Sequence, residues 1–222
     1  MIEITQEFKS TYSGASIGLL LINNVKNQKK NTELSARKRQ IESEIRKQFD
    51  GKDRQYLNNL DNNKAYDQYY KMFKKTYHIL LQLESIAFKG KSIPDVDCLV
   101  EAMFMAEIKN QFLTAGHDVD KLELPIKVDV SHGNEKYILM NGKEQVCTQG
   151  DMFMYDSKGV ISSILNGPDS RTKIDGSTNH VLYIVYAPEG IEKESVKKHL
   201  EDIRDNISII SDNFTVERLD VL

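Results

Sequence analysis

Side chains that could do chemistry are densest in the segment Ala115-Gly116-His117-Asp118-Val119-Asp120-Lys121-Leu122. An imidazole beside carboxylates can act as a general base, or it can orient a substrate hydroxyl. A second polar segment, Gly167-Pro168-Asp169-Ser170-Arg171-Thr172, follows further along the chain. The plainer interpretation of the first segment is a polar turn after a helix, with Gly116 as the C-terminal cap and His117 exposed. Spacing alone leaves both interpretations open.

The sequence carries none of the common hydrolase or nucleotide-binding signatures. It has no glycine-rich phosphate loop, no His-Glu-x-x-His and no nucleophile elbow. Ser35-x-x-Lys38 and Ser211-Asp212-Asn213 resemble motifs of penicillin-recognising serine enzymes, but the second leaves no room for the Lys-Thr-Gly strand that should follow it. The five histidines and two cysteines lack metal-ligand spacing. We therefore expect neither a metal ion nor a cofactor.

Length and composition are typical of a globular protein. The chain has 222 residues, of which 40% are apolar and 28% charged, enough for one domain with a sizeable core. No apolar run reaches the roughly 18 residues of a membrane span, and Met1-Ile2-Glu3-Ile4 does not begin a secretory signal. With so few cysteines, these features predict a cytoplasmic protein with no membrane partner.

Charge is distributed unevenly along the chain. Residues 1–91 carry 17 Lys+Arg against 10 Asp+Glu, a net of +7, whereas residues 92–222 carry 13 against 23, a net of −10. A basic part of this kind can form a surface that binds a polyanion. The plainer alternative is that its lysines simply keep surface helices solvated.

Hydrophobic periodicity predicts four helical regions. They cover residues 32–49, residues 66–88 (beginning with the tyrosines at 66–77), residues 94–112 and residues 191–207. Asn31 or Thr32 can cap the first of these, and Pro94 suits the first position of the third. The polar residues 50–63 are expected to be a connection. The tyrosine stripe could stack nucleic-acid bases, but large apolar groups at helical spacing more often face the core, which we expect here.

Apolar runs and two-residue periodicity predict the strands. The apolar run 15–22 is expected as a buried strand, with a short buried helix as the alternative that its length leaves open. Residues 181–186 are expected as a further buried strand and 214–219 as an edge strand. Hairpins are expected around Asn141-Gly142 and around 156–159, with a further strand at 125–130. Because strands and helices are segregated along the chain, the predicted class is α+β with a mixed sheet and flanking helices.

Residues 93–188 resemble the B3/B4 domain of the phenylalanyl-tRNA synthetase β subunit, and resemble still more closely stand-alone proteins that carry this domain. Arg171-Thr172 belongs to the pattern of the stand-alone proteins. The resemblance is only loose over residues 1–91. The matching motifs are, in order, Ile93-Pro94-Asp95-Val96-Asp97, His117-Asp118-Val119-Asp120-Lys121-Leu122, Met140-Asn141-Gly142, Met154-Tyr155-Asp156-Ser157-Lys158-Gly159 and Asn166-Gly167-Pro168-Asp169-Ser170.

This resemblance implies one α+β domain over residues 1–222, with a strand and basic helices in 1–91, the best-matched part in 93–188, and a helix and edge strand in 189–222. In the synthetase the domain hydrolyses tyrosine wrongly attached to the phenylalanine tRNA, and a His and a Glu read the tyrosine hydroxyl. Here Ala115 stands at the position of that His and Arg171 at the position of that Glu. Both hydroxyl readers are therefore missing.

The resemblance implies an RNA-binding protein whose partner is tRNA or aminoacyl-tRNA. It implies no aminoacylation. It leaves open an ester hydrolase activity, the hydrolysis of mischarged aminoacyl-tRNA in trans, for which no catalytic residue is assigned. Arg171 could hold a phosphate or a carboxylate by paired hydrogen bonds. The expected pocket residues are His117 and Asp118 on one wall and Asn166, Gly167, Ser170, Arg171 and Thr172 on the other, and the expected RNA contacts are Arg37, Lys38, Arg39, Arg46 and Lys47.

Two other functions remain open. The chain could bind a small amino-acid-like ligand without nucleic acid, because Arg171 fits a free carboxylate as readily as a phosphate and the net −10 over residues 92–222 opposes RNA. It could also be a catalytically silent interaction protein. Neither the cognate ligand nor the oligomeric state is indicated by the sequence.

Overall fold

The structure, a computed structural model, describes residues 2–222. The helices are α1 (Gln6–Thr11), α2 (Thr32–Gln48), α3 (Arg54–Asn58), α4 (Asp61–Met72), α5 (His78–Lys89), α6 (Cys98–Asn110) and α7 (Lys193–Ser208), with a 3-10 turn at Val119–Lys121. The strands are β1 (Ile2–Ile4), β2 (Ser16–Asn23), β3 (Thr114–Asp118), β4 (Ile126–Val130), β5 (Lys136–Ile138), β6 (Glu144–Val146), β7 (Met152–Asp156), β8 (Gly159–Ser163), β9 (Gly167–Pro168), β10 (Val181–Ala187) and β11 (Thr215–Val221).

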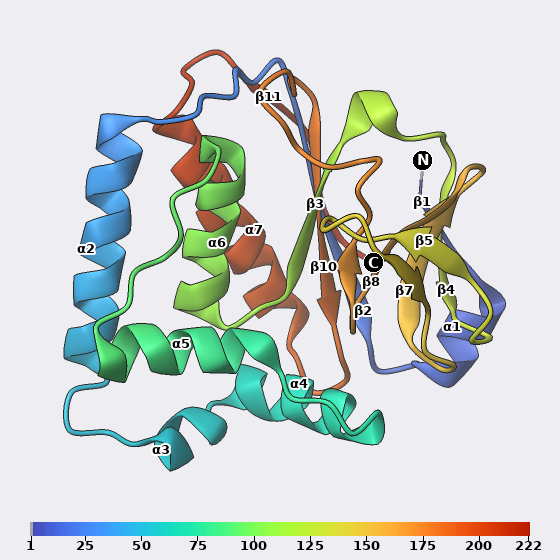
Figure 1. The fold of residues 1–222 in the computed structure, drawn as a ribbon, viewed down its shortest axis with the longest axis horizontal. Coiled ribbons are helices and arrows are strands. Elements are labelled where there is room, and N and C mark those ends of the chain that lie inside the picture. The colour runs from blue at the N-terminus through green and yellow to red at the C-terminus, as the bar shows by residue number, and fades with distance from the viewer. Residues whose placement is uncertain (1) are drawn as a thin grey trace.

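The strands form two main sheets rather than one. A four-stranded antiparallel sheet has the order β11-β2-β10-β3, and a five-stranded sheet has the order β1-β4-β7-β8-β9. The five-stranded sheet is mixed, because β1 runs parallel to β4 while the other neighbours are antiparallel. In Figure 1 the four-stranded sheet lies between the five-stranded sheet and the helices α2, α5, α6 and α7, whereas α1 lies beside β4. The predicted α+β class with a mixed sheet and flanking helices is confirmed.

The continuous apolar run of β2 has a physical reason in this arrangement. β2 is a central strand between β10 and β11, and helix α7 contacts it. Residues 16–22 are therefore all buried, which favours an unbroken apolar run over an alternating one.

The predicted helix over 32–49 is α2, whose first turn is capped by the Asn31 side chain accepting from the Leu34 N–H at 2.9 Å. The predicted hairpin at Asn141-Gly142 joins β5 to β6, and β11 is the predicted edge strand.

Two expectations about local structure were wrong. Residues 50–63 are more than a connection, because Asp53 caps the short helix α3 and α4 begins at Asp61. The third predicted helix begins at Cys98 and not at Pro94. Side-chain carboxylates hold the preceding residues extended: Glu42 accepts from the Ile93 N–H at 2.9 Å, and Glu101 from the Val96 N–H at 3.0 Å. No helix within residues 2–222 is long and apolar enough to cross a membrane.

The tyrosine stripe faces the core, as predicted. Tyr66 and Tyr77 are fully buried and stack with ring centroids 4.4 Å apart. The Tyr66 hydroxyl donates to the Tyr186 carbonyl at 2.6 Å and accepts from the Leu113 N–H at 3.0 Å. One side chain of α4 therefore connects the helical layer to β10 and to the residues just before β3. These tyrosines share one hydrophobic core with Leu19 of β2.

This double hydrogen bond predicts the effect of removing one oxygen atom. Tyr66→Phe should keep the stacking but leave the Leu113 N–H and one lone pair of the Tyr186 carbonyl buried without partners. We expect the free energy of unfolding to fall by roughly 1–3 kcal/mol, measured by urea denaturation. Tyr56→Phe, at an exposed position of α3, is the matched control and should change it little. Equal stability of the two variants would contradict the assignment.

Candidate functional site

A pocket of about 310 Å³, the main pocket below, opens between α5, α6, β3 and the loop that follows β9. A concave site of mostly apolar lining with a few polar groups is the usual form of a small-ligand site. Its polar side chains include His78, Glu107 and Lys173. Its apolar and small residues are Ile79, Val100, Met103, Phe104, Leu113, Ala115, Gly116, Met140, Gly167, Pro168 and Ile174.

One side of the main pocket is the edge strand β3. Helix α6 ends at Gln111, which takes a left-handed conformation, and the chain then enters β3, where Gly116 pairs with Tyr183 and His117 with Leu182. The interpretation of this segment as an exposed polar turn capped by Gly116 was therefore wrong. A Cβ atom at Gly116 would lie 2.8 Å from the Cδ1 atom of Ile174. Glycine thus lets the loop residue Ile174 approach the strand and form the pocket wall.

His117 is fully buried and does not line the main pocket. Its Nδ1 lies 2.7 Å from the Thr172 hydroxyl oxygen, and that hydroxyl donates its proton to Asp169. Nδ1 is therefore the protonated nitrogen, and Nε2 has no hydrogen-bond partner within residues 2–222. Burial, assisted by the charge of Arg171, lowers the pKa of His117 to about 3. The imidazole is neutral near pH 7 and supports the fold around the pocket.

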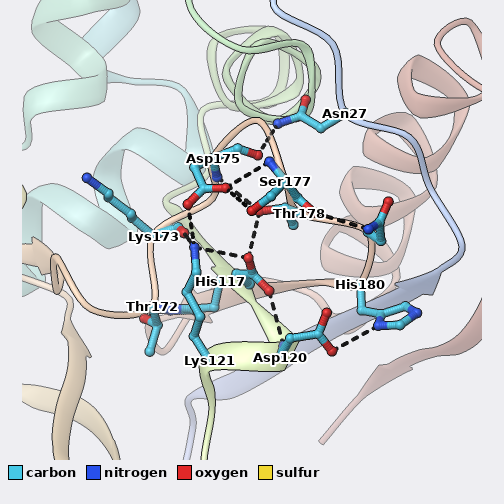
Figure 2. A network of polar contacts seen from close by, with 12 residues as sticks. Asn27, His117, Asp120, Lys121, Thr172, Lys173, Asp175, Ser177, Thr178 and His180 are labelled. Atoms are coloured by element: carbon cyan, nitrogen blue, oxygen red, sulfur yellow. Dashed lines mark hydrogen bonds and ion pairs between the residues drawn. The ribbon is translucent and has the colours of Figure 1, made fainter.

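A polar network that includes Lys121, Asp175 and Thr178 ties the end of β3 to the loop of residues 171–180 (Figure 2), and Asp118 anchors this network. Its buried carboxylate accepts from the Thr178 hydroxyl at 2.8 Å and lies 3.0 Å from the Lys121 ammonium. Lys121 also contacts Asp175 at 2.7 Å and donates to the Lys173 carbonyl at 2.9 Å. Hydrogen bonds from Lys121 and Ser177 hold the pKa of Asp175 well below its ordinary value. These three contacts, to Thr178, Asp175 and the Lys173 carbonyl, fix the loop that carries Lys173 and Ile174.

Arg171 is occupied by protein groups. Its guanidinium contacts the Asp156 carboxylate at 2.9 Å and that of Asp169 at 3.5 Å, and it donates to the Lys121 carbonyl at 2.9 Å. The expected paired hydrogen bonds to a ligand phosphate or carboxylate would have to displace these partners. In this geometry Arg171 orients the loop and does not line the main pocket.

The other expected pocket residues are divided between the pocket and its support. Gly167 lines the main pocket. Asn166 lies beside it, accepting from the Lys75 ammonium at 2.9 Å and donating to Ser163, which lines the pocket. The Ser170 N–H donates to the Ile138 carbonyl at 2.8 Å. The two polar segments do meet, because the Asp118 N–H donates to the Thr172 carbonyl at 2.8 Å.

Glu107 of α6 is a pocket residue that sequence reasoning missed. It is 3% exposed, and one carboxyl oxygen accepts from the Thr114 N–H at 2.7 Å. Burial raises the pKa of Glu107 to about 8. Glu107 is one of three charged residues in the mostly apolar segment 98–113, with Glu101 and Lys109, so the sequence alone did not single it out.

The expected RNA-contacting cations of α2 are unequally available. Lys38 has no exposed side-chain surface and lies 2.6 Å from Asp95 and 2.8 Å from Glu101. The expectation of an RNA contact at Lys38 is therefore not supported by its position. The other four are partly or fully accessible to solvent. Arg37 lies near Glu44, and Arg39 forms an ion pair with Glu42. Arg46 donates to the carbonyls of Ile86 and Lys91, whereas Lys47 has no ion-pair partner in the described residues.

The burial of His117 predicts acid sensitivity. Its pKa of about 3 in the fold lies below the ordinary 6.5, so the unfolded chain takes up a proton as the pH falls below 6.5 while the fold does not. Stability from this group is complete above pH 6.5 and is lost on acidification toward pH 3, by up to about 1.4 kcal/mol per pH unit. His199, also buried with a pKa of about 3, should add a similar slope.

Urea unfolding between pH 6.5 and 4 measures this slope. His117→Gln should be less stable at pH 7 but show a shallower loss with falling pH. His132→Gln, at an exposed position, should keep the slope of the unmodified protein. An unchanged slope in His117→Gln would mean that this imidazole is protonated in the fold.

Comparisons with known proteins place this chain in a family. The family model described as the B3/4 domain matches residues 62–207. A solved N-terminal fragment of the phenylalanyl-tRNA synthetase β-subunit from Pyrococcus horikoshii is similar to this chain, with a TM-score of 0.48 and 11% identity, over 98% of this chain and 54% of that one. The chain thus spans little more than half the length of that fragment. No curated protein matches. Because the family model covers well over half of its residues, the chain belongs to the B3/4 domain family.

Proposed function

We propose that this protein binds the aminoacylated end of a tRNA, with the amino acid in the main pocket. One observation carries the proposal: two segments that resemble motifs of the synthetase editing domain, one at 115–122 and one at 166–172, both contribute residues to a single pocket. Ala115 and Gly116 come from the first, and Gly167 and Pro168 from the second. The volume of about 310 Å³ and the apolar walls suit one amino-acid side chain.

The selectivity we propose differs from that of a tyrosine-editing pocket. Ala115, at the position of the family's His, lines the main pocket with a methyl group, and Arg171, at the position of the family's Glu, is held by Asp156 and Asp169. Neither residue can read a phenolic hydroxyl there. The walls formed by Met103, Phe104 and their apolar neighbours favour an aliphatic or thioether side chain.

A path for the RNA leads away from the main pocket. An adjoining pocket of about 270 Å³ has Gln82 and Phe104 in common with it and extends to Lys91. The Lys91 carbonyl accepts from Arg46 of α2 at 2.9 Å, so the basic end of α2 lies next to the adjoining pocket. Phosphates leaving the main pocket along this path would approach Arg46 and Lys47.

The second candidate is a binding module for a free amino-acid-like ligand without RNA. The observation that favours it is that the pocket side chains include an acidic group, Glu107, and a basic group, Lys173. A free amino acid is a zwitterion, with an ammonium group that suits Glu107 and a carboxylate that suits Lys173. Under this alternative α2 plays no part in binding.

Hydrolysis of the ester would need a water molecule activated in the main pocket. His117 does not meet this need, because it is buried outside the pocket and its pKa is lowered to about 3. The pocket side chains able to exchange a proton are His78, Glu107 and Lys173. We therefore propose binding as the primary function, with deacylation as a measured outcome.

Lys47→Glu should separate the two candidates. If phosphates contact the end of α2, the variant should bind aminoacyl-tRNA about tenfold more weakly, with a smaller dependence of affinity on salt, in filter-binding titrations. Lys9→Glu on α1 reverses an equivalent exposed charge away from this path and is the control. Affinity that is indifferent to salt in the unmodified protein would contradict RNA binding and favour the free amino acid.

Gly116→Ala tests the pocket itself. The added methyl group must displace Ile174 and narrow the main pocket. Across a panel of mischarged tRNAs, the variant should lose about tenfold or more of the preference for the best-bound amino acid, as expected for excluding one or two methylenes. Its affinity for uncharged tRNA should be unchanged.

Ester release by the unmodified protein in the same panel would establish a deacylase, and its absence would leave binding alone. An unaltered amino-acid preference would exclude the main pocket.

A further inference from the structure

One acidic group in the main pocket is only half satisfied by the protein. Glu107 lies on α6 with its side chain among Met103, Phe104 and Leu113. One of its oxygens accepts from the Thr114 N–H at 2.7 Å. Its second oxygen makes no hydrogen bond or ion pair to residues 2–222, and although the residue as a whole is 97% buried, this oxygen is not sealed off from the cavity that the residue borders. Ionising a carboxyl group in such a place is costly unless a ligand supplies a donor and a compensating charge.

The elements around Glu107 offer no cation to complete it. Helix α5 contributes His78, and burial lowers the pKa of this histidine. The buried hydroxyls of Tyr66, Tyr70 and Tyr77 lie on α4 and just after it. Burial raises the pKa values of these tyrosines, and Glu107 raises them further. His199 of α7 reaches Thr114 and is neutral for the same reason as His117. Lys173 lines the pocket but makes no ion pair with Glu107.

We infer that Glu107 receives the free α-ammonium group of the bound amino acid, so that the site accepts aminoacyl groups and rejects those whose nitrogen is acylated. The inference rests on the proposed function of the main pocket and adds the group by which the ligand is selected. Burial raises the pKa of Glu107 to about 8, so the empty pocket holds the neutral acid near pH 7. A bound ammonium group stabilises the ionised form, because it supplies a donor and a compensating charge together, whereas a phosphate or carboxylate does not stabilise that form and a ligand hydroxyl gives only a weaker hydrogen bond.

The remaining pocket groups fit the rest of such a ligand. The α-carbon of an aminoacyl ester carries its ammonium group, its side chain and its ester carbon together. With the ammonium at Glu107, the side chain has the apolar wall of Met103, Phe104 and Ile174, and Lys173 is available to the negatively charged nucleotide beyond the ester. An N-acylated group has one N–H and no charge, and its acyl carbon would occupy the space beside a buried carboxyl oxygen.

The test compares free and acetylated amines in matched pairs. The probes are amides of 3′-amino-3′-deoxyadenosine with leucine, methionine and phenylalanine, which resist hydrolysis, and the N-acetyl form of each. Isothermal titration should show that acetylation weakens binding to the unmodified protein by about tenfold or more, the usual effect of losing a charge-assisted hydrogen bond.

Glu107→Gln should weaken binding of the free amines by a similar factor and leave the acetylated probes unchanged, so that the two forms bind equally. Gln keeps an acceptor for the Thr114 N–H and has nearly the shape of Glu, so the fold should survive; thermal unfolding of the variant checks this. Glu84→Gln, on α5 outside the main pocket, should keep the preference of the unmodified protein.

The outcomes separate this inference from the proposed function. If free and acetylated probes bind the unmodified protein equally well, the pocket binds aminoacyl groups but Glu107 does not select the amine, and the inference is overturned while the proposed function stands. If Glu107→Gln retains the preference for free amines, the inference is likewise wrong. If no probe binds in either form, the main pocket is not an aminoacyl site and both proposals fall.

Discussion

The arrangement of the site depends on one buried carboxylate, that of Asp118. A carboxylate removed from water is stable only with a cation or hydrogen-bond donors, and Asp118 obtains both from Lys121 and Thr178. Lys121 belongs to the turn after β3, while Thr178 belongs to the loop that crosses back to β10. Satisfying Asp118 therefore brings two distant segments together and fixes the loop between them, which carries Ile174 over Gly116 as a pocket wall.

This explains why the two segments predicted from the sequence meet in the fold while several of their polar residues support the pocket and do not line it. Polar residues beside glycine indicated a site, and the two segments do meet. Whether His117 is exposed depends, however, on β3 pairing with β10, a long-range contact that no local spacing encodes. Once paired, His117 and Asp118 are buried, and their neighbours Ala115 and Gly116 face the cavity. The polar residues act as supports, and the pocket is lined by residues with little chemical signature.

The same distinction holds for the fold. Elements with strong local patterns were predictable: the apolar run of β2, the capped stripe of α2 and the Asn141-Gly142 hairpin. The division into two sheets was not, because it depends on contacts such as the one between β1 and β4, where Thr5 donates to Asp129 across 124 positions of sequence. A three-residue strand has too few residues to show a period. The start of α6 was missed because Glu42, which is 51 positions from Ile93, and Glu101 of α6 itself hold residues 93–96 extended.

Ala115, Arg171 and Glu107 have mutually consistent roles under the proposed function. Replacing a pocket His by Ala115 removes a hydrogen-bonding group and leaves a methyl group. An arginine at the position of the Glu would be an unpaired cation in an apolar pocket, but Asp156 and Asp169 draw it out into the supporting network. The acidic group in the cavity comes from α6, through Glu107, rather than from β3. A carboxyl group fixed at the backbone of Thr114 suits a feature that every aminoacyl ligand has, its amine. Apolar walls then discriminate among side chains by size and shape alone, which gives modest selectivity.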